Sequence, residues 1–121
     1  MNKSKALECA EELRDNVSRV MGQENAMYAS CLNNIALMQK QLGNIETSID
    51  MYTQALHIYE ESVGKKHNSY AITLANLGAG YKAFAETTKG MEKLQLLERA
   101  KEALDDAYNI MKEISGISLK V

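Results

Sequence analysis

Residues 28–35 read YASCLNNI, and residues 70–77 read YAITLANL, 42 residues later. Tyr, Ala, Leu and Asn coincide at four of the eight positions, and a large aliphatic residue closes both phrases. Gly22 and Gly64 are also 42 residues apart, and each follows a run of helix-forming residues. Glycine in that place is typical of the position just after a helix. The sequence therefore contains an internal repeat, which predicts a fold of stacked units.

The second half of the unit recurs with a larger offset of 52 residues. The matched residues are Ser48, Tyr52, Ala55, Ile58 and Gly64 in the first copy and Ala100, Leu104, Ala107, Ile110 and Gly116 in the second. The second unit therefore carries about ten extra residues, which must fall between Tyr81 and Ala100.

Apolar residues within each unit return with the period of a helix. One such stripe consists of Ile45, Ile49, Tyr52, Leu56 and Tyr59. Gly43 is expected to end the helix before this stripe, with Asn44 and Asn68 as N-caps of the helices that follow them. The pattern predicts five helices, at about 4–21, 26–42, 45–63, 68–86 and 91–114. The first is expected to bury Ala6, Ala10, Leu13 and Val17.

Composition agrees with an all-α chain, because it lacks Pro and Trp and is rich in strong helix formers. The net charge of −2 argues against a nucleic-acid or anionic-membrane partner. The N-terminus lacks the apolar run of a signal peptide, and no stretch has the length and hydropathy of a membrane span. Two cysteines in helical sequence, Cys9 and Cys31, indicate reduced thiols and a cytoplasmic or otherwise reducing location.

Catalytic and metal-binding patterns are absent from the sequence. His57 and His67 are the only histidines, and neither has a Cys, Asp or Glu at a metal-ligand spacing. Gly78 and Gly80 lie in predicted helix, not in a phosphate-binding loop. We therefore expect neither enzymatic activity nor a cofactor or metal ion.

At the repeated residues the chain resembles a tetratricopeptide repeat array, whose unit is a helix–turn–helix. The matching positions of the first unit are Leu32, Ile35, Ala36, Gly43, Ser48, Tyr52 and Ala55. Those of the second are Leu74, Leu77, Gly78, Tyr81, Ala100, Leu104 and Ala107. The 42-residue spacing is similar to the kinesin-light-chain-like subtype, in which a His-containing loop, here GKKH at residues 64–67, leads into the next unit. The resemblance implies one domain over residues 1–121, a short right-handed α-solenoid with a half unit at 4–22 and full units at 26–64 and 68–116.

The resemblance also implies a concave groove lined by the first helix of each unit. Its positions in the first unit are Ser30, Asn33, Leu37, Lys40 and Gln41. Those in the second unit are Ile72, Ala75, Ala79 and Lys82, followed by Ala83. The predicted function is a non-catalytic adaptor or scaffold that binds a peptide or helix of a partner protein there.

The polar groove residues each have two interpretations. In the resembled subtype an Asn of this phrase binds peptide backbone, which implies that role for Asn33; the alternative is a solvated helix Asn. Lys40 and Lys82, one repeat apart, suit an acidic partner, and the alternative is two ordinary exposed lysines. Asn34 and Asn76 also recur, and we expect them to bond structurally to a neighbouring loop.

A second hypothesis makes the chain an architectural subunit or a self-associating one. Its open solenoid ends and the 84–97 insertion would then form the contact surface. The insertion supplies Leu94, Leu96 and Leu97, which could dock a neighbouring chain.

Overall fold

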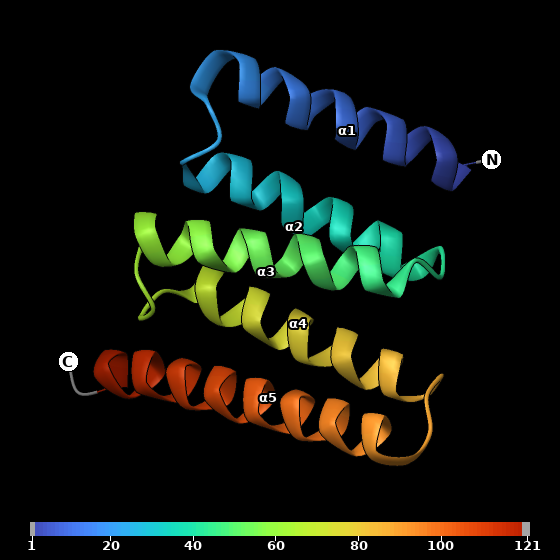
Figure 1. Cartoon of the computed structure of the whole chain (residues 1–121). Coiled ribbons are helices and arrows are strands. Elements are labelled where there is room, and N and C mark those ends of the chain that lie inside the picture. Colours follow the sequence, from blue (N-terminus) through green and yellow to red (C-terminus); the bar gives the residue numbers. More distant parts are fainter. Residues whose placement is uncertain (1, 120–121) are drawn as a thin grey trace.

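Within residues 2–119 the chain folds into five helices that lie side by side in one row (Figure 1). The computed structural model describes the backbone of these residues and the side-chain surroundings of residues 5–116. The helices are α1 (Asn2–Met21), α2 (Ala26–Gln41), α3 (Ile45–Ser62), α4 (Asn68–Ala85) and α5 (Gly90–Leu119). Successive helices run in opposite directions and pack on one another. The architecture is a short all-α solenoid, as the sequence predicts.

The predicted ranges of α1 to α4 agree with the structure to within two residues, whereas α5 was predicted too short at its C-terminal end. The sequence match paired Gly116 with the helix-ending Gly64, but Gly116 lies inside α5. A glycine permits a helix to end without forcing it to, because in a helix interior it costs only about 1 kcal/mol relative to alanine.

Left-handed glycines end α2 and α3, as the sequence predicts. Gly43 has a φ of 91° and Gly64 a φ of 86°, a region that side chains with a Cβ rarely adopt. The Gly64 amide donates to the carbonyl of Tyr59 at 2.9 Å, which satisfies one of the last carbonyls of α3. Both glycines therefore turn the chain sharply enough for the next helix to pack back on the last.

The N-caps differ from those predicted. Asn44 occupies the N-cap position of α3, but its side chain makes no capping bond and donates instead to Oε1 of Gln39 at 2.8 Å. Asn68 is the first residue of α4, and the N-cap is His67, whose Nδ1 accepts from the Ser69 amide at 3.1 Å. A ring nitrogen can fill the place of the usual Asn or Ser oxygen, since capping needs only an acceptor in reach.

The insertion lengthens helices instead of forming a loop. Relative to the first hairpin, two of the ten residues extend α4, one extends the connection and seven extend the start of α5. Residues 90–97 are therefore the first two turns of α5, a helix of 30 residues.

The core follows the row of helices in two clusters. The larger cluster joins α1 to α4 through Val17, Tyr28, Leu32, Tyr59 and Tyr70. The smaller lies between α2, α3 and α4 and centres on Tyr52, which is 0% exposed. Small buried residues let the helices approach one another closely. They include Ala29, Ala36, Ala55, Gly78 and Gly80.

The first helix is less buried than predicted. Of its expected stripe, Val17 is buried and Ala10 partly so, whereas Ala6 is exposed and Leu13 is 58% exposed. The reason is that α1 packs on α2 alone, so the side of α1 that Leu13 occupies has no neighbour within the described chain.

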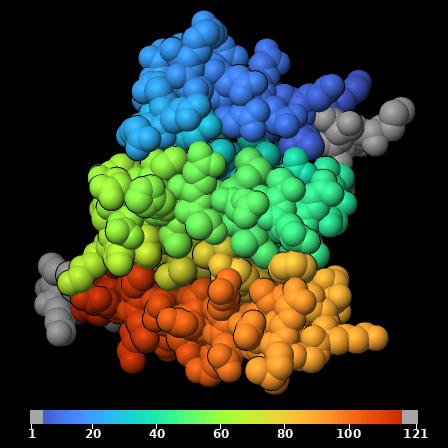
Figure 2. All heavy atoms as spheres, in the orientation of Figure 1, coloured from blue at the N-terminus to red at the C-terminus, as the bar shows by residue number. Residues whose placement is uncertain are grey.

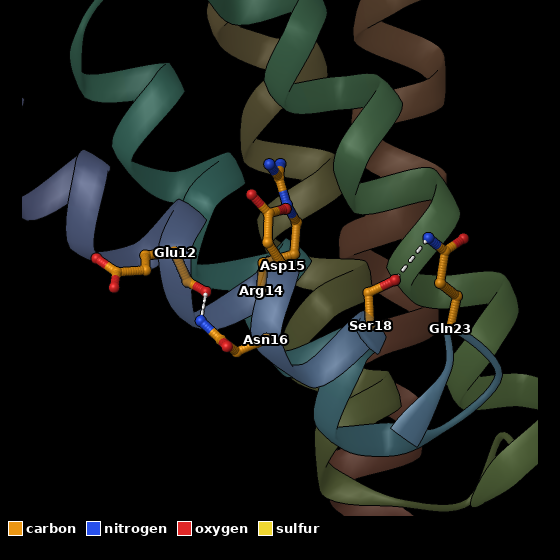
Figure 3. Close-up of polar contacts among 6 residues, drawn as sticks. All are labelled: Glu12, Arg14, Asp15, Asn16, Ser18 and Gln23. Carbon is orange, nitrogen blue, oxygen red and sulfur yellow. Dashed lines mark hydrogen bonds and ion pairs between the residues drawn. The ribbon is translucent and has the colours of Figure 1, made fainter. Parts of the chain in front are cut away.

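The turn from α1 to α2 is held by short-range polar bonds. Gln23 reaches back to α1, where its amide donates to Oγ of Ser18 at 3.0 Å (Figure 3). Asn25 caps α2 by accepting from the Tyr28 amide at 2.9 Å, and its Nδ2 donates to the Gly22 carbonyl. The bend is thus fixed by its own side chains. None of the helices described is both long and apolar enough to cross a membrane.

Candidate functional site

Helices α2 and α4, the first helices of the two units, approach each other more closely than the second helices α3 and α5 do. Within the described chain, α2 and α4 contact each other, although α3 separates them in sequence, whereas α3 and α5 do not. First helices that converge while second helices diverge give a concave face lined by the first helices. The predicted groove positions all lie on these two helices.

An amide pair joins the two helices on this face. Nδ2 of Asn76 in α4 donates to Oδ1 of Asn33 in α2 at 3.2 Å. Both side chains are half-buried. The expectation that Asn76 bonds to a neighbouring loop is therefore wrong, since its partner is a helix side chain. Asn34 is exposed.

The remaining groove positions on α2 are mostly open to solvent. Leu37, Gln41 and Ser30 are exposed, and Lys40 is half-buried. The Ser30 hydroxyl lies 3.0 Å from the hydroxyl of Tyr59 in α3, so Ser30 also ties the first hairpin together.

The groove positions on α4 form an apolar strip that ends in a cation. Ile72 is exposed, Ala75, Ala79 and Ala83 are half-buried, and Lys82 is exposed. The ion pairs found within the described residues involve Arg14, Lys65, Lys66 and Lys101, so neither Lys40 nor Lys82 is neutralised by one.

The three leucines proposed as an assembly surface do not lie together. Leu96 is buried, which excludes it from any surface that a partner could reach. Leu94 and Leu97 are exposed. The alternation follows from the helix, because Leu96 lies on the side of α5 that also buries Ala100 and Ala103 against α4.

A furrow on the opposite face is the feature that sequence reasoning missed. Figure 2 looks onto α1, α3 and α5, with a narrow band of α4 visible between α3 and α5. Three shallow hollows of about 340, 280 and 200 Å³ lie along the α4–α5 junction, and the 280 Å³ one also reaches α3. Their floor includes Leu74 and Tyr81, and the Arg99 guanidinium lies 5.9 Å from the centre of the Tyr81 ring. The divergence of α3 from α5, which no local pattern encodes, creates this furrow.

Cys31, His57 and His67 lie in different parts of the fold, on α2, on α3 and at the start of α4. Burial raises the pKa of the Cys31 thiol, although the nearby Arg14 guanidinium acts in the opposite direction. The thiol is therefore protonated at neutral pH and a poor nucleophile. His67 serves as a cap and His57 is exposed on α3. Among the described residues no group of three His, Cys, Asp or Glu side chains could hold a metal ion.

Comparison with known families agrees with this geometry. No curated protein matches the chain significantly. The family model described as tetratricopeptide repeat matches residues 30–89, from the second turn of α2 to the connection before α5. These residues contain the tyrosine phrase of α4, most of the phrase of α2 and the small residues that bring the helices together. Over residues 30–89 the chain is therefore similar to the tetratricopeptide repeat family.

Proposed function

We propose that this chain is a non-catalytic protein–protein interaction module that holds a peptide or helix of a partner in the concave face of α2 and α4. Repeat arrays of this family generally act in protein–protein interaction and use their concave surface for it. The observation that carries the proposal is the Asn33–Asn76 pair, which places two half-buried amides side by side across the groove.

The amide pair retains hydrogen-bonding capacity that a peptide backbone can use. An Asn side chain offers two N–H donors and a carbonyl oxygen with two lone pairs. The bond between the two residues uses one donor of Asn76 and one lone pair of Asn33. Nδ2 of Asn33 and Oδ1 of Asn76 therefore remain for a ligand, and they match the C=O and N–H of an extended peptide.

The two groove lysines favour an acidic ligand. Lys40 and Lys82 occupy equivalent places one repeat apart, and both ammonium groups are without an ion pair within the described residues. Charges of one sign at this spacing steer a ligand of the opposite sign and fix its register. The apolar floor of the groove is formed by Leu37 on α2 and by Ile72, Ala75 and Ala79 on α4.

The finer family assignment and the location are also part of this proposal. The 42-residue spacing and the GKKH loop at residues 64–67 support the kinesin-light-chain-like subtype, with unit boundaries at 26–64 and 68–116. Cys9 and Cys31 are free thiols, which supports a reducing, cytoplasmic setting.

A charge reversal tests the proposal. Peptides are selected from a random display library on the wild-type chain, and the affinities of enriched peptides are measured by fluorescence anisotropy at several salt concentrations. We expect acidic peptides that bind more weakly as salt rises, because exposed charges are screened. Lys40→Glu with Lys82→Glu should weaken binding by about tenfold or more, which corresponds to about 1.4 kcal/mol.

The matched control is Lys89→Glu with Lys93→Glu, which changes the net charge equally at exposed lysines away from the groove. It should leave affinity within a factor of about two of wild type at moderate salt. Asn33→Ala should weaken binding at every salt concentration, since it removes hydrogen bonds and no charge. Enriched peptides that bind the groove and control variants equally well would show that the concave face is not the binding surface.

A further inference from the structure

The last helix repeats a surface that the chain buries elsewhere. With the 52-residue offset, the stripe of α3 has a counterpart on α5. We call the α3 residues the inner seam, and these are Ile45, Ile49, Tyr52, Leu56 and Tyr59. We call the α5 residues the end seam, and these are Leu97, Lys101, Leu104, Tyr108 and Met111. The two seams have the same helical spacing, and four of the five end-seam residues are large and apolar or aromatic.

The inner seam is covered by α4. Tyr52 is fully buried, Tyr59 is buried, and Ile49 and Leu56 are partly so. The covering residues belong to the same hydrophobic clusters and return at i, i+4, i+7 and i+11 along α4. They are Tyr70, Leu74, Leu77 and Tyr81. The first helix of one hairpin therefore packs on the second helix of the hairpin before it.

The end seam has no such cover within the described chain. Leu97 is 37%, Leu104 39% and Tyr108 66% exposed. Leu94, which the insertion adds one turn before Leu97, is exposed as well. Figure 1 shows α5 as the outermost helix of the row, opposite α1. Exposed apolar residues that follow one side of a helix, here interrupted by Lys101, are typical of an interaction surface.

We propose that the end seam is a docking site for an amphipathic helix of a partner protein, and that this helix has the pattern of α4. The stacking of α4 on α3 is an interface already present in this molecule, and the end seam continues it by one step. The partner helix would carry large apolar residues at i, i+4, i+7 and i+11 and small residues between them.

A second copy of this chain does not offer such a helix. The first helices α2 and α4 are each packed between two neighbours within the described chain. The free side of α1 presents Leu13, which corresponds to Ala55 of α3. Ala55 is buried in one cluster with Ala29 and Leu32 of α2, so α1 lacks a first helix just as α5 does. Two such surfaces do not complement each other in the way that α3 and α4 do.

The charged residues along the end seam indicate which charges the partner helix should carry. Lys101 replaces Ile49, and its ammonium donates to Oδ2 of Asp105 at 2.7 Å. Glu98 and Asp105 flank Lys101 on the exposed side of α5. A partner helix with Lys or Arg along one edge would meet these two carboxylates, so the site favours an apolar helix with a basic edge.

A peptide with the sequence of residues 66–87 serves as the probe, because it copies α4 together with its cap. Its binding to the full chain is followed by fluorescence anisotropy of a labelled peptide. A control peptide carries Leu74→Ser and Leu77→Ser. We expect the probe to bind at least about tenfold more tightly than the control peptide, a difference of about 1.4 kcal/mol.

Two variants of the chain locate the binding. Tyr108→Glu and Leu97→Glu place a charge in the end seam at exposed positions, and each should weaken probe binding by about tenfold or more. Val20→Glu is the matched control, since Val20 is a 75% exposed apolar residue of α1. Circular dichroism confirms that each variant keeps its helix content.

Three results would overturn the proposal. The first is that the probe binds no better than the control peptide. The second is that the probe binds the seam variants as tightly as wild type, as it would if it displaced α4. The third is that sedimentation shows a dimer that Tyr108→Glu abolishes, which would make a second copy the occupant. The Lys40→Glu, Lys82→Glu variant should bind the probe normally, so this test and the groove test can fail independently.

Discussion

Helices α3 and α5 carry equivalent seams in opposite surroundings. Tyr52 of α3 is covered on both sides by α2 and α4, while its counterpart Leu104 of α5 packs on α4 alone and keeps 39% of its surface in water. In a stack where each unit contacts only its neighbours, place in the row decides how much of a seam contributes to stability. The same repeat pattern therefore builds core in one hairpin and a binding surface in the other.

Truncation of equivalent residues in the two seams should give the largest difference in unfolding free energy. Tyr52→Ala should cost about 3–5 kcal/mol of unfolding free energy, because it empties a fully buried site. Leu104→Ala should cost roughly 1 kcal/mol, because part of that side chain is already solvated. Urea unfolding followed by circular dichroism measures both.

Tyr52→Phe is the control for packing, since it keeps the ring and removes only the hydroxyl. It should cost no more than about 1.5 kcal/mol. Equal losses of unfolding free energy for Tyr52→Ala and Leu104→Ala would mean that the two seams are equally buried in solution. The conclusion that the end seam is exposed would then be wrong.

Substitution of two glycines of α4 tests how closely α5 and α3 approach that helix. A Cβ on Gly78 would lie 2.8 Å from Cγ of Leu104 and 3.2 Å from the Ala100 carbonyl oxygen, whereas one on Gly80 would meet only Cγ1 of Ile49 at 3.2 Å. Gly78→Ala should destabilise the chain by about 1–2 kcal/mol, because crowding exceeds the gain in helix propensity. Gly80→Ala should be neutral within about 0.5 kcal/mol, since the side chain of Ile49 can shift.

The double variant Gly78→Ala, Leu104→Ala separates crowding from other causes. Its loss should be smaller than the sum of the two single losses, because the second change removes the side chain that the new methyl meets. Strict additivity of the unfolding free energies would argue against the close contact between α4 and the end seam.

The two matched glycines at the ends of α3 and α5 differ in backbone conformation. Gly64 has a φ of 86°, so Gly64→Ala should cost about 1 kcal/mol. Gly116 lies within α5 with open space around its α-carbon, so Gly116→Ala should stabilise by up to about 1 kcal/mol. Thermal unfolding midpoints should therefore move in opposite directions; two downward shifts would place the end of α5 before Gly116.

The sequence predicted what is encoded locally. The repeated tyrosine phrase and the glycines Gly43 and Gly64 placed four helices to within two residues, because helical period and left-handed turns depend on a few neighbours. The cap of α4 was assigned to Asn68 instead of His67, since the choice depends on which side chain can turn toward the Ser69 amide. The end of α5 was predicted wrongly at Gly116, because the residues around a glycine decide whether a helix ends there.

The groove could be predicted in outline only. Counting along the repeat placed Asn33 and Lys40 on one face of α2, and the structure shows that Asn33 of this face reaches α4. The bond from Asn76 to Asn33 was missed, because it depends on how far two first helices converge across an intervening helix. Leu96 was assigned to the surface because a run of leucines does not reveal which of them a 30-residue helix turns inward.

The charge that distinguishes the two seams gives the smallest effect. Lys101 stands where the inner seam has Ile49, and its hydrogen bond to Asp105, together with the negative charge of that residue, raises the pKa of the ammonium. Asp105→Asn should lower this pKa toward the ordinary value for lysine, which an NMR titration of the Lys101 side chain can follow, with no measurable change in unfolding. A helix docked on the end seam would also lower the pKa, because it removes the ammonium from water. In the Asp105→Asn chain, where the carboxylate no longer competes, addition of the α4 peptide should therefore lower the pKa of Lys101 a second time. An unchanged titration on peptide binding would place the bound helix away from Lys101.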